Sequence, residues 1–152
     1  MESCKEAHGG GLKNLYLGAE VVQAEKDRAR NFPSWDLATR QLCDLELLLN
    51  GAFSPLEGFL GHDDYQSVLK EMRLTDGLLW PIPINLDVTE AFAGLIKEGA
   101  SIALRDLEGV LVATMEIASV FRPDKFAEAE AVFGTSDDRH PGVAYLFHQV
   151  ND

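Results

Sequence analysis

The chain has 152 residues, of which 46% are hydrophobic and 25% charged, a composition typical of a globular domain with its own core. Its 13 basic and 25 acidic residues give a formal net charge of −12, which repels the phosphates of nucleic acid, so we predict no nucleic-acid partner. No apolar run approaches the ~20 residues that a membrane-spanning helix needs, and two cysteines make neither a disulfide framework nor a zinc site. We therefore expect a cytoplasmic protein without membrane contact.

The first 17 residues are polar and glycine-rich. His8-Gly9-Gly10-Gly11 lacks the Gly-Lys-Ser/Thr ending of a phosphate-binding loop, so residues 1–17 are predicted to form a flexible lead-in. A charged segment over residues 19–30 predicts a short helix that ends at Asn31-Phe32-Pro33. Residues 35–37 follow as a brief extended piece.

A leucine stripe over residues 42–49, at helical spacing, predicts an amphipathic helix with Thr39 as its N-cap. Asn50 and Gly51 tolerate the positive φ of a helix C-cap, and the chain turns at Ser54-Pro55. Apolar residues after the turn are expected to fold back on the leucines. The residues that shape this corner are Asn50, Gly51, Phe53, Ser54, Pro55, Gly58 and Phe59.

The segment after the corner predicts a helix and then a strand. Residues 63–72 carry an apolar stripe at helical spacing: Tyr65, Val68, Leu69 and Met72. Residues 75–77 form a turn. Residues 79–88 alternate as in a strand, and Pro81 and Pro83 remove backbone donors, which predicts a strand at the border of a sheet.

The rest of the chain predicts three helices and a β-hairpin. Thr89 is predicted to cap a helix that carries apolar residues up to Ile96 and closes at Gly99. Residues 101–105 and 110–120 predict a β-hairpin. A helix with Pro123 in its first turn is expected to end at Gly134, and a last helix is expected from Pro141 through Phe147. The chain is thus predicted to be an α+β protein.

The four histidines, His8, His62, His140 and His148, lack the spacing of helical or knuckle-type metal ligands. The acid pairs Asp63-Asp64 and Asp137-Asp138 offer oxygen ligands for Mg²⁺, but helix capping explains the first pair and loop solubility the second.

Cys43 has no neighbouring base in the sequence, so we expect a half-buried helix cysteine and no nucleophile. Arg30 and Arg122 stand beside prolines as boundary residues, with anion binding as the alternative. The residue chemistry therefore indicates no catalytic, cofactor-binding or metal site.

The corner nevertheless resembles the N-terminal domain of the sulfate adenylyltransferases, also called ATP sulfurylases. The resemblance continues along nearly the whole chain, in the family's order. It rests on His8-Gly9-Gly10, on the run from Asp44 to Leu60, on Asp63-Asp64-Tyr65 and Met72-Arg73-Leu74, on Trp80-Pro81-Ile82-Pro83-Ile84, on Ile102-Ala103-Leu104-Arg105-Asp106, on Arg122-Pro123-Asp124, on residues 128–135 and on residues 140–146.

This resemblance implies a PUA-like domain over residues 18–152, with a small mixed β-barrel or sheet and several peripheral helices. It also implies a parent enzyme that joins sulfate to Mg-ATP, giving adenylyl sulfate and pyrophosphate. The family's Gln-x-Arg-Asn motif, its paired histidines and its Gly-Arg-Asp segment belong to the next domain and do not occur here; Arg28 stands where Gln would precede Arg30-Asn31. We expect no catalytic, cofactor-binding or metal residue in this chain.

The resemblance predicts a scaffold whose partner is the catalytic domain of the same enzyme, in a parent that is a possible homo-oligomer, and it predicts that the chain alone is inactive. A stand-alone PUA-like binding or regulatory module is the alternative. RNA recognition, known for other PUA-like folds, is disfavoured by the charge of −12.

Overall fold

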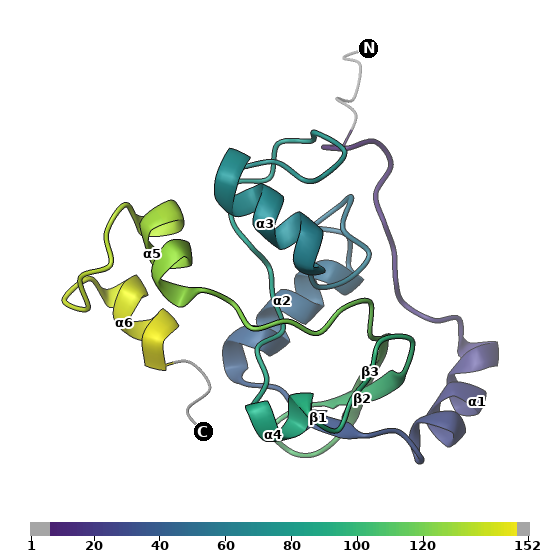
Figure 1. Ribbon diagram of the computed structural model, residues 1–152. Coiled ribbons are helices and arrows are strands. Elements are labelled where there is room, and N and C mark those ends of the chain that lie inside the picture. The colour runs from purple at the N-terminus through teal and green to yellow at the C-terminus, as the bar shows by residue number, and fades with distance from the viewer. Residues whose placement is uncertain (1–6, 149–152) are drawn as a thin grey trace, which may run out of the picture. The chain divides into compact units, whose positions relative to one another are not determined.

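The structure is a computed structural model that describes residues 7–148. The chain divides into two compact units, each made of two separate stretches. Unit 1 contains the chain up to Phe59 together with Gly99–Ile117, and unit 2 contains Leu60–Glu98 together with the chain from Ala118 onward. Figure 1 labels the elements of both units.

Unit 1 is built on a mixed three-stranded sheet with the order β1-β2-β3. The strands β1 (Ser34–Asp36) and β2 (Ser101–Arg105) are parallel, and Ser34 pairs with Ala103. The strands β2 and β3 (Leu111–Glu116) form the predicted antiparallel hairpin. The central residues of β2 are Ile102, Ala103 and Leu104, each at most 1% exposed, so the core of this unit is centred on β2.

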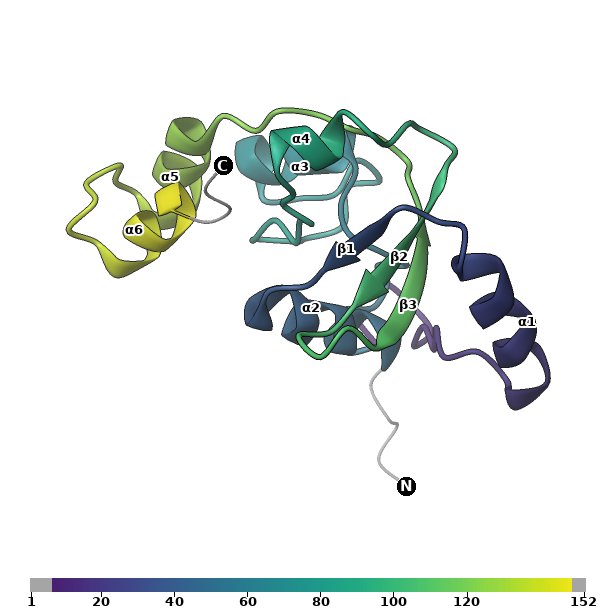
Figure 2. The ribbon, with the colours of Figure 1, turned by 90° about the horizontal axis from the view of Figure 1, so that it is seen from below.

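Two helices complete unit 1. The helix α1 (Ala19–Ala29) lies beside β3, as Figure 2 shows, and the Thr114 hydroxyl donates to the Glu25 carboxylate at 2.8 Å. The helix α2 (Thr39–Leu49) buries Gln41, Leu45 and Leu48, so Leu45 and Leu48 of the predicted stripe are confirmed, whereas Leu42 and Leu49 are only half-buried. Thr39 is the first helical residue of α2 and not its cap. The Gln41 side chain instead accepts the backbone N–H of Ala38 at 3.0 Å.

Unit 2 contains the helices α3 (His62–Glu71), α4 (Glu90–Ala93), α5 (Lys125–Phe133) and α6 (Pro141–His148). Thr89 caps α4, as predicted, by accepting the Phe92 N–H at 3.2 Å, although α4 ends well before Ile96. Asp124 caps α5 through the N–H groups of Phe126 and Ala127, so Pro123 precedes the helix. Gly134 ends α5 with a φ of 69°, as predicted.

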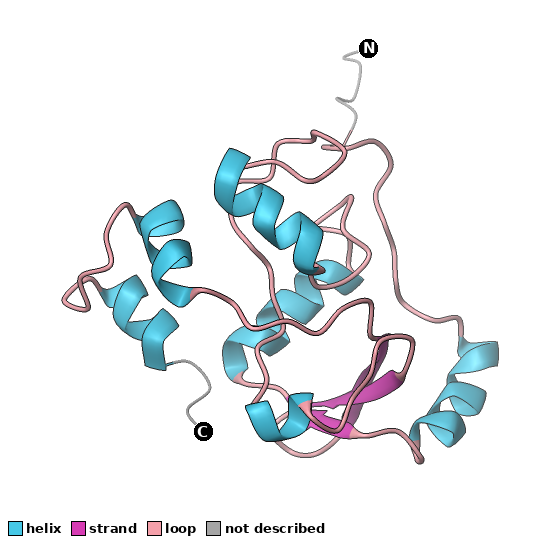
Figure 3. Cartoon of the chain, in the orientation of Figure 1, coloured by secondary structure: helices cyan, strands magenta, loops and turns pink. Residues whose placement is uncertain are grey.

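The predicted strand over residues 79–88 is wrong. Only Leu79 bridges a neighbouring segment, at Arg73, and Figure 3 draws the rest as loop. Trp80 and Ile84 are buried, whereas Ile82 is 41% exposed, so the alternating apolar residues do not share one buried face. Pro81 and Pro83 lack the N–H groups that a ladder needs, which accounts for the difference.

Two further expectations need correction. Met72 is not part of the apolar face of α3: it follows the helix with a φ of 52° and is 56% exposed. The strand β3 ends at Glu116 and not at Val120. The α+β class is confirmed: residues 7–148 contain six helices and three strands.

Candidate functional site

The corner, defined here as residues 50–59, begins where α2 ends. Gly51 has a φ of 84°, and its N–H donates to the Leu48 carbonyl at 3.3 Å. The Asn50 side chain accepts the Ala52 N–H at 2.9 Å, which supports the turn. Asn50 and Gly51 therefore act as the helix stop that the sequence predicts.

Ser54 is the buried polar residue at the centre of the corner, with 6% exposure. Its hydroxyl donates to the Gly51 carbonyl at 2.6 Å and accepts the Lys13 backbone N–H at 2.8 Å. The Ser54–Pro55 peptide bond is cis, and the Leu56 N–H donates to the Phe53 carbonyl at 2.8 Å across the turn. Both hydrogen-bonding functions of the hydroxyl are thus used, which explains a buried serine here.

The corner holds a segment that precedes it by some forty residues. The Leu15 N–H donates to the Leu49 carbonyl at 3.0 Å, and Lys13 Nζ lies 2.5 Å from Glu57 Oε1. The Lys13 ammonium group lowers the pKa of the exposed Glu57 carboxyl by hydrogen bonding and by its charge. A Cβ atom at Gly51 would overlap the Lys13 carbonyl oxygen. Residues 13–15 are therefore packed against the corner, although they belong to the predicted lead-in.

The other corner residues have less specific surroundings. Phe53, Pro55 and Phe59 are half-buried, and the Phe53 N–H donates to the Leu47 carbonyl at 3.1 Å. Gly58 is half-buried too, and a Cβ atom there would meet no atom within 4 Å. The corner thus contains a turn, a buried hydroxyl and apolar packing, and its residue types suit structural roles.

The residues considered for chemistry lie apart from the corner and from one another. His8, His62, His140 and His148 are exposed, and the rings of His62 and His140 lie 5.1 Å from those of Phe121 and Phe133. Within the described range 7–148, no group of three or more His, Cys, Asp or Glu side chains is placed to hold a metal ion.

The acid pairs have local hydrogen-bonding roles. Asp63 and Asp64 lie in the first turn of α3, and Asp64 Oδ1 accepts both the backbone N–H and the hydroxyl of Thr75 at 2.8 Å. Asp137 binds Arg139, whose guanidinium lowers the pKa of the Asp137 carboxyl.

Cys43 is exposed on α2, which corrects the expectation of a half-buried side chain. The buried stripe of α2 begins at Gln41, one residue before the predicted Leu42, and this rotation turns Cys43 outward. Arg30 lies 3.0 Å from Asp27, and Arg122 lies 2.7 Å from Glu90, so both arginines form exposed ion pairs.

Tyr65 has a contact that the sequence does not reveal. The residue is 0% exposed, and its hydroxyl donates to Glu128 Oε2 at 2.8 Å. Burial, with the hydrogen bond to Glu128 and the charges of Glu128, Asp87 and Asp124, raises the pKa of the Tyr65 hydroxyl far above its ordinary value. The spacing of the α3 stripe identifies Tyr65 as a core residue, but it contains no signal for a partner 63 positions away.

Near this pair, a shallow depression of about 490 Å³ lies between α3 and α5. Its lining residues on α3 are Gln66, Ser67, Leu69, Lys70 and Glu71, and those on α5 are Ala127 and Ala131. The residues that line it include neither a histidine nor a cysteine.

Among the described residues, no helix is both long and apolar enough to cross a membrane.

Comparison with known proteins places these features in a family. Residues 5–152 match the family of PUA-like domains. The chain is 47% identical over 146 residues to a sulfate adenylyltransferase of Eremothecium gossypii, covering 95% of this chain and 29% of that protein. It is 46% identical over 142 residues to a sulfate adenylyltransferase of Symbiobacterium thermophilum, covering 93% of this chain and 36% of the relative.

A solved structure, titled as a hexameric APS kinase from Thiobacillus denitrificans, matches with a TM-score of 0.70 and 38% sequence identity. The match covers 78% of this chain and 24% of that one. The chain therefore spans about a third or less of the proteins it resembles. It belongs to the PUA-like domain family and is homologous to the N-terminal PUA-like domain of sulfate adenylyltransferases.

Proposed function

We propose that the chain serves as the N-terminal domain of a sulfate adenylyltransferase, where it is a scaffold for a separate catalytic domain. The observation that carries this proposal is the 47% identity to a sulfate adenylyltransferase of which the chain covers only 29%. In the complete enzyme, sulfate and Mg-ATP would be the substrates, and adenylyl sulfate and pyrophosphate the products. The cytoplasm is the compartment we propose.

The chemistry of the described residues supports a scaffold. Adenylyl transfer brings a triphosphate and a sulfate together, which requires preorganised positive charge and oriented N–H donors. The chain carries a net charge of −12, and Arg30 and Arg122 are already in ion pairs with carboxylates. Mg-ATP does not fit the described residues, because they offer neither a metal-holding cluster nor a phosphate-binding loop. We therefore propose that the chain alone does not transfer adenylyl groups.

The partner proposed for this domain is the catalytic domain of the same enzyme. A homo-oligomeric parent is part of the proposal, supported by the structural relative, which is described as a hexamer. A domain that positions a neighbour needs a shape fixed by its own contacts. The hydrogen bonds among Lys13, Gly51 and Ser54 supply such a shape in the corner.

The test is a domain exchange. In one protein, this chain replaces the homologous 146-residue region of the Eremothecium gossypii sulfate adenylyltransferase, and the isolated chain is assayed in parallel. Pyrophosphate release that depends on both ATP and sulfate is measured. We expect activity in the chimera and none in the isolated chain.

Two results would contradict the proposal. Activity of the isolated chain would show that it carries its own catalytic site. A chimera that is folded by circular dichroism, yet has no activity, would show that the chain does not support that catalytic domain, and it would favour a stand-alone module.

A further inference from the structure

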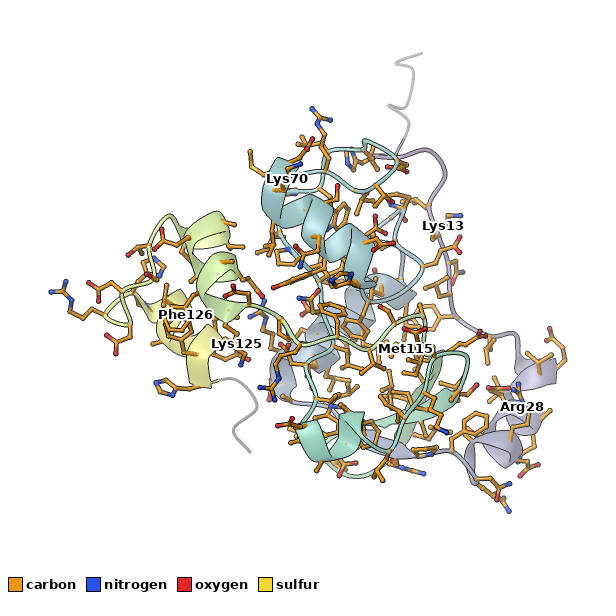
Figure 4. All side chains as sticks on the ribbon, viewed as in Figure 1. Lys13, Arg28, Lys70, Met115, Lys125 and Phe126 are labelled. Carbon is orange, nitrogen blue, oxygen red and sulfur yellow. The ribbon has the colours of Figure 1, made fainter. Side chains whose placement is uncertain are left out.

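Residues 124–148 form a helical hairpin with a core of its own, here named the α5–α6 arm. Ala129 and Val143 are 0% exposed, Leu146 is 6% exposed, and Phe133 and Phe147 pack against this cluster. Figure 4 labels Phe126 on α5. Its ring lies 4.8 Å from that of Phe147 on α6. The arm therefore has a small apolar core of its own, although Phe126 and Tyr145 stay exposed outside it.

The segment just before the arm is fixed to α3 and α4. The Ser119 hydroxyl accepts the His62 N–H at 2.9 Å, the Phe121 ring lies 5.1 Å from those of His62 and Tyr65, and Arg122 pairs with Glu90 at 2.7 Å. The arm begins two residues after Arg122, at the helix cap Asp124. Pro123 is the residue between the anchored segment and the arm.

The contact between the arm and α3 is close at one end and open at the other. At Tyr65, the buried hydroxyl meets Glu128 of α5 at 2.8 Å. Farther along α3, the depression of about 490 Å³ extends to Lys70 and Glu71, and α5 faces it with the methyl groups of Ala127 and Ala131. Most of the residues that line this depression are exposed, so it is an open hollow at the surface between the two helices.

We propose that the α5–α6 arm opens from α3 as one body about Pro123, and that the Tyr65–Glu128 hydrogen bond is the latch that closes it. Opening of this kind keeps the Ala129–Val143–Leu146 core and the anchored residues 119–122 in place. It breaks the charge-assisted hydrogen bond between Tyr65 and Glu128 and exposes the Tyr65 side chain. Regions that open without loss of their own core do so at a lower free energy than global unfolding.

Hydroxyl-radical labelling of side chains, measured by mass spectrometry on the whole chain, tests the proposal. Opening exposes the Tyr65 side chain and leaves the core of the arm covered, so we expect Tyr65 to be labelled, after correction for intrinsic reactivity, faster than Val143 of the arm and Leu37 of unit 1, all three of which are 0% exposed in the structure. A Tyr65 as protected as Leu37, or a Val143 labelled as fast as Tyr65, would overturn the proposal without any substitution.

A variant then tests the latch. Glu128→Gln keeps the shape of the acceptor and removes its charge, and it is expected to speed labelling of Tyr65 by roughly 10-fold, with Val143 still protected. Glu130→Gln is the matched control, because Glu130 is exposed on the same helix, and it should leave both labelling rates unchanged. An equal acceleration at Tyr65 and Val143, or no acceleration at Tyr65, would refute the latch.

Discussion

The corner of unit 1 and the α5–α6 arm of unit 2 are stabilised in different ways. In the corner, backbone groups of Lys13 and Leu15 bond to Ser54 and Leu49, so segments remote in sequence are joined through fixed main-chain positions. In the arm, apolar side chains of two adjacent helices pack on one another. A substitution that disturbs a fixed backbone conformation is costly, whereas neighbouring side chains can shift to accommodate a changed side chain. Single substitutions should therefore affect the two regions unequally.

The largest effect is expected for Gly51→Ala. The φ of 84° disfavours any residue with a Cβ atom, and that atom would also overlap the Lys13 carbonyl oxygen. We expect a loss of about 3 kcal/mol in the free energy of unfolding, because the left-handed conformation alone costs roughly 1–2 kcal/mol. Denaturation by urea measures it.

Two other glycines separate the causes of this loss. Gly77 has a φ of 89° with open space around it, so Gly77→Ala is expected to cost only the conformational part, about 1 kcal/mol. Gly58→Ala is expected to change stability by less than about 0.5 kcal/mol, since its surroundings are open and its φ is ordinary. Equal losses for all three variants would show that the packing of Lys13 on Gly51 is not what distinguishes the corner.

Tyr65→Phe tests unit 2 through its pH dependence. The pKa of Tyr65 is raised in the folded protein, so its neutral form contributes stability that is complete below the unfolded pKa of about 10 and is lost as the pH rises above it. We expect the wild-type free energy of unfolding to fall as the pH rises above about 10, and the variant to show a shallower fall. At pH 7 the variant should be less stable by about 2 kcal/mol. Identical pH profiles would contradict the assignment.

Ser54→Ala removes a hydroxyl that serves two partners in the corner. The Lys13 N–H and the Gly51 carbonyl each lose a hydrogen bond in a largely buried setting. We expect a loss of about 1–2 kcal/mol in thermal or chemical unfolding. Ser136→Ala, at a half-buried loop serine of the arm region, is the control, and a similar loss there would weaken the contrast between the two regions.

The smallest effect is expected for Asp44→Asn on α2. Burial raises the pKa of the Asp44 carboxyl, and Arg40 at 3.8 Å partly offsets this. The protonated form is therefore favoured by folding, and its contribution is complete below about pH 3.9 and lost as the pH rises through the folded pKa. At pH 7 the variant should be slightly more stable, by up to about 0.5 kcal/mol. Glu46→Gln, an exposed change on the same helix, should have no such effect. If Asp44→Asn is instead less stable than the wild type, the attraction between Asp44 and Arg40 outweighs the cost of burying the Asp44 carboxylate.

The sequence predicted the elements whose signals are local. Gly51 and Gly134 are predicted as helix ends because glycine, which has no Cβ atom, adopts a positive φ at little cost. Leu45 and Leu48 of α2 are buried as predicted, but the prediction missed Gln41 because a polar residue does not look like a core residue. Residues 79–88 alternate as a strand does, but alternation does not say whether a partner strand exists.

Contacts between remote segments could not be predicted. The bond from Lys13 to Ser54 and that from Tyr65 to Glu128 join residues 41 and 63 positions apart. Both depend on how the chain folds back and not on any local pattern. The residues of the corner identify it in the sequence, whereas its contacts with residues 13–15 are seen only in the structure.

The parallel pairing of β1 with β2 has a consequence for how the chain can be cut. Ser34 of β1 pairs with Ala103 of β2. In the sequence, all of Leu60–Glu98 lies between the two stretches that make unit 1. A ribosome must therefore deliver the chain past Arg105 before β1 can join the sheet, and closing so long a loop carries an entropic cost. A fragment that stops at Phe59 would contain the corner but not the buried strand β2, and neither unit can be excised by a single cleavage.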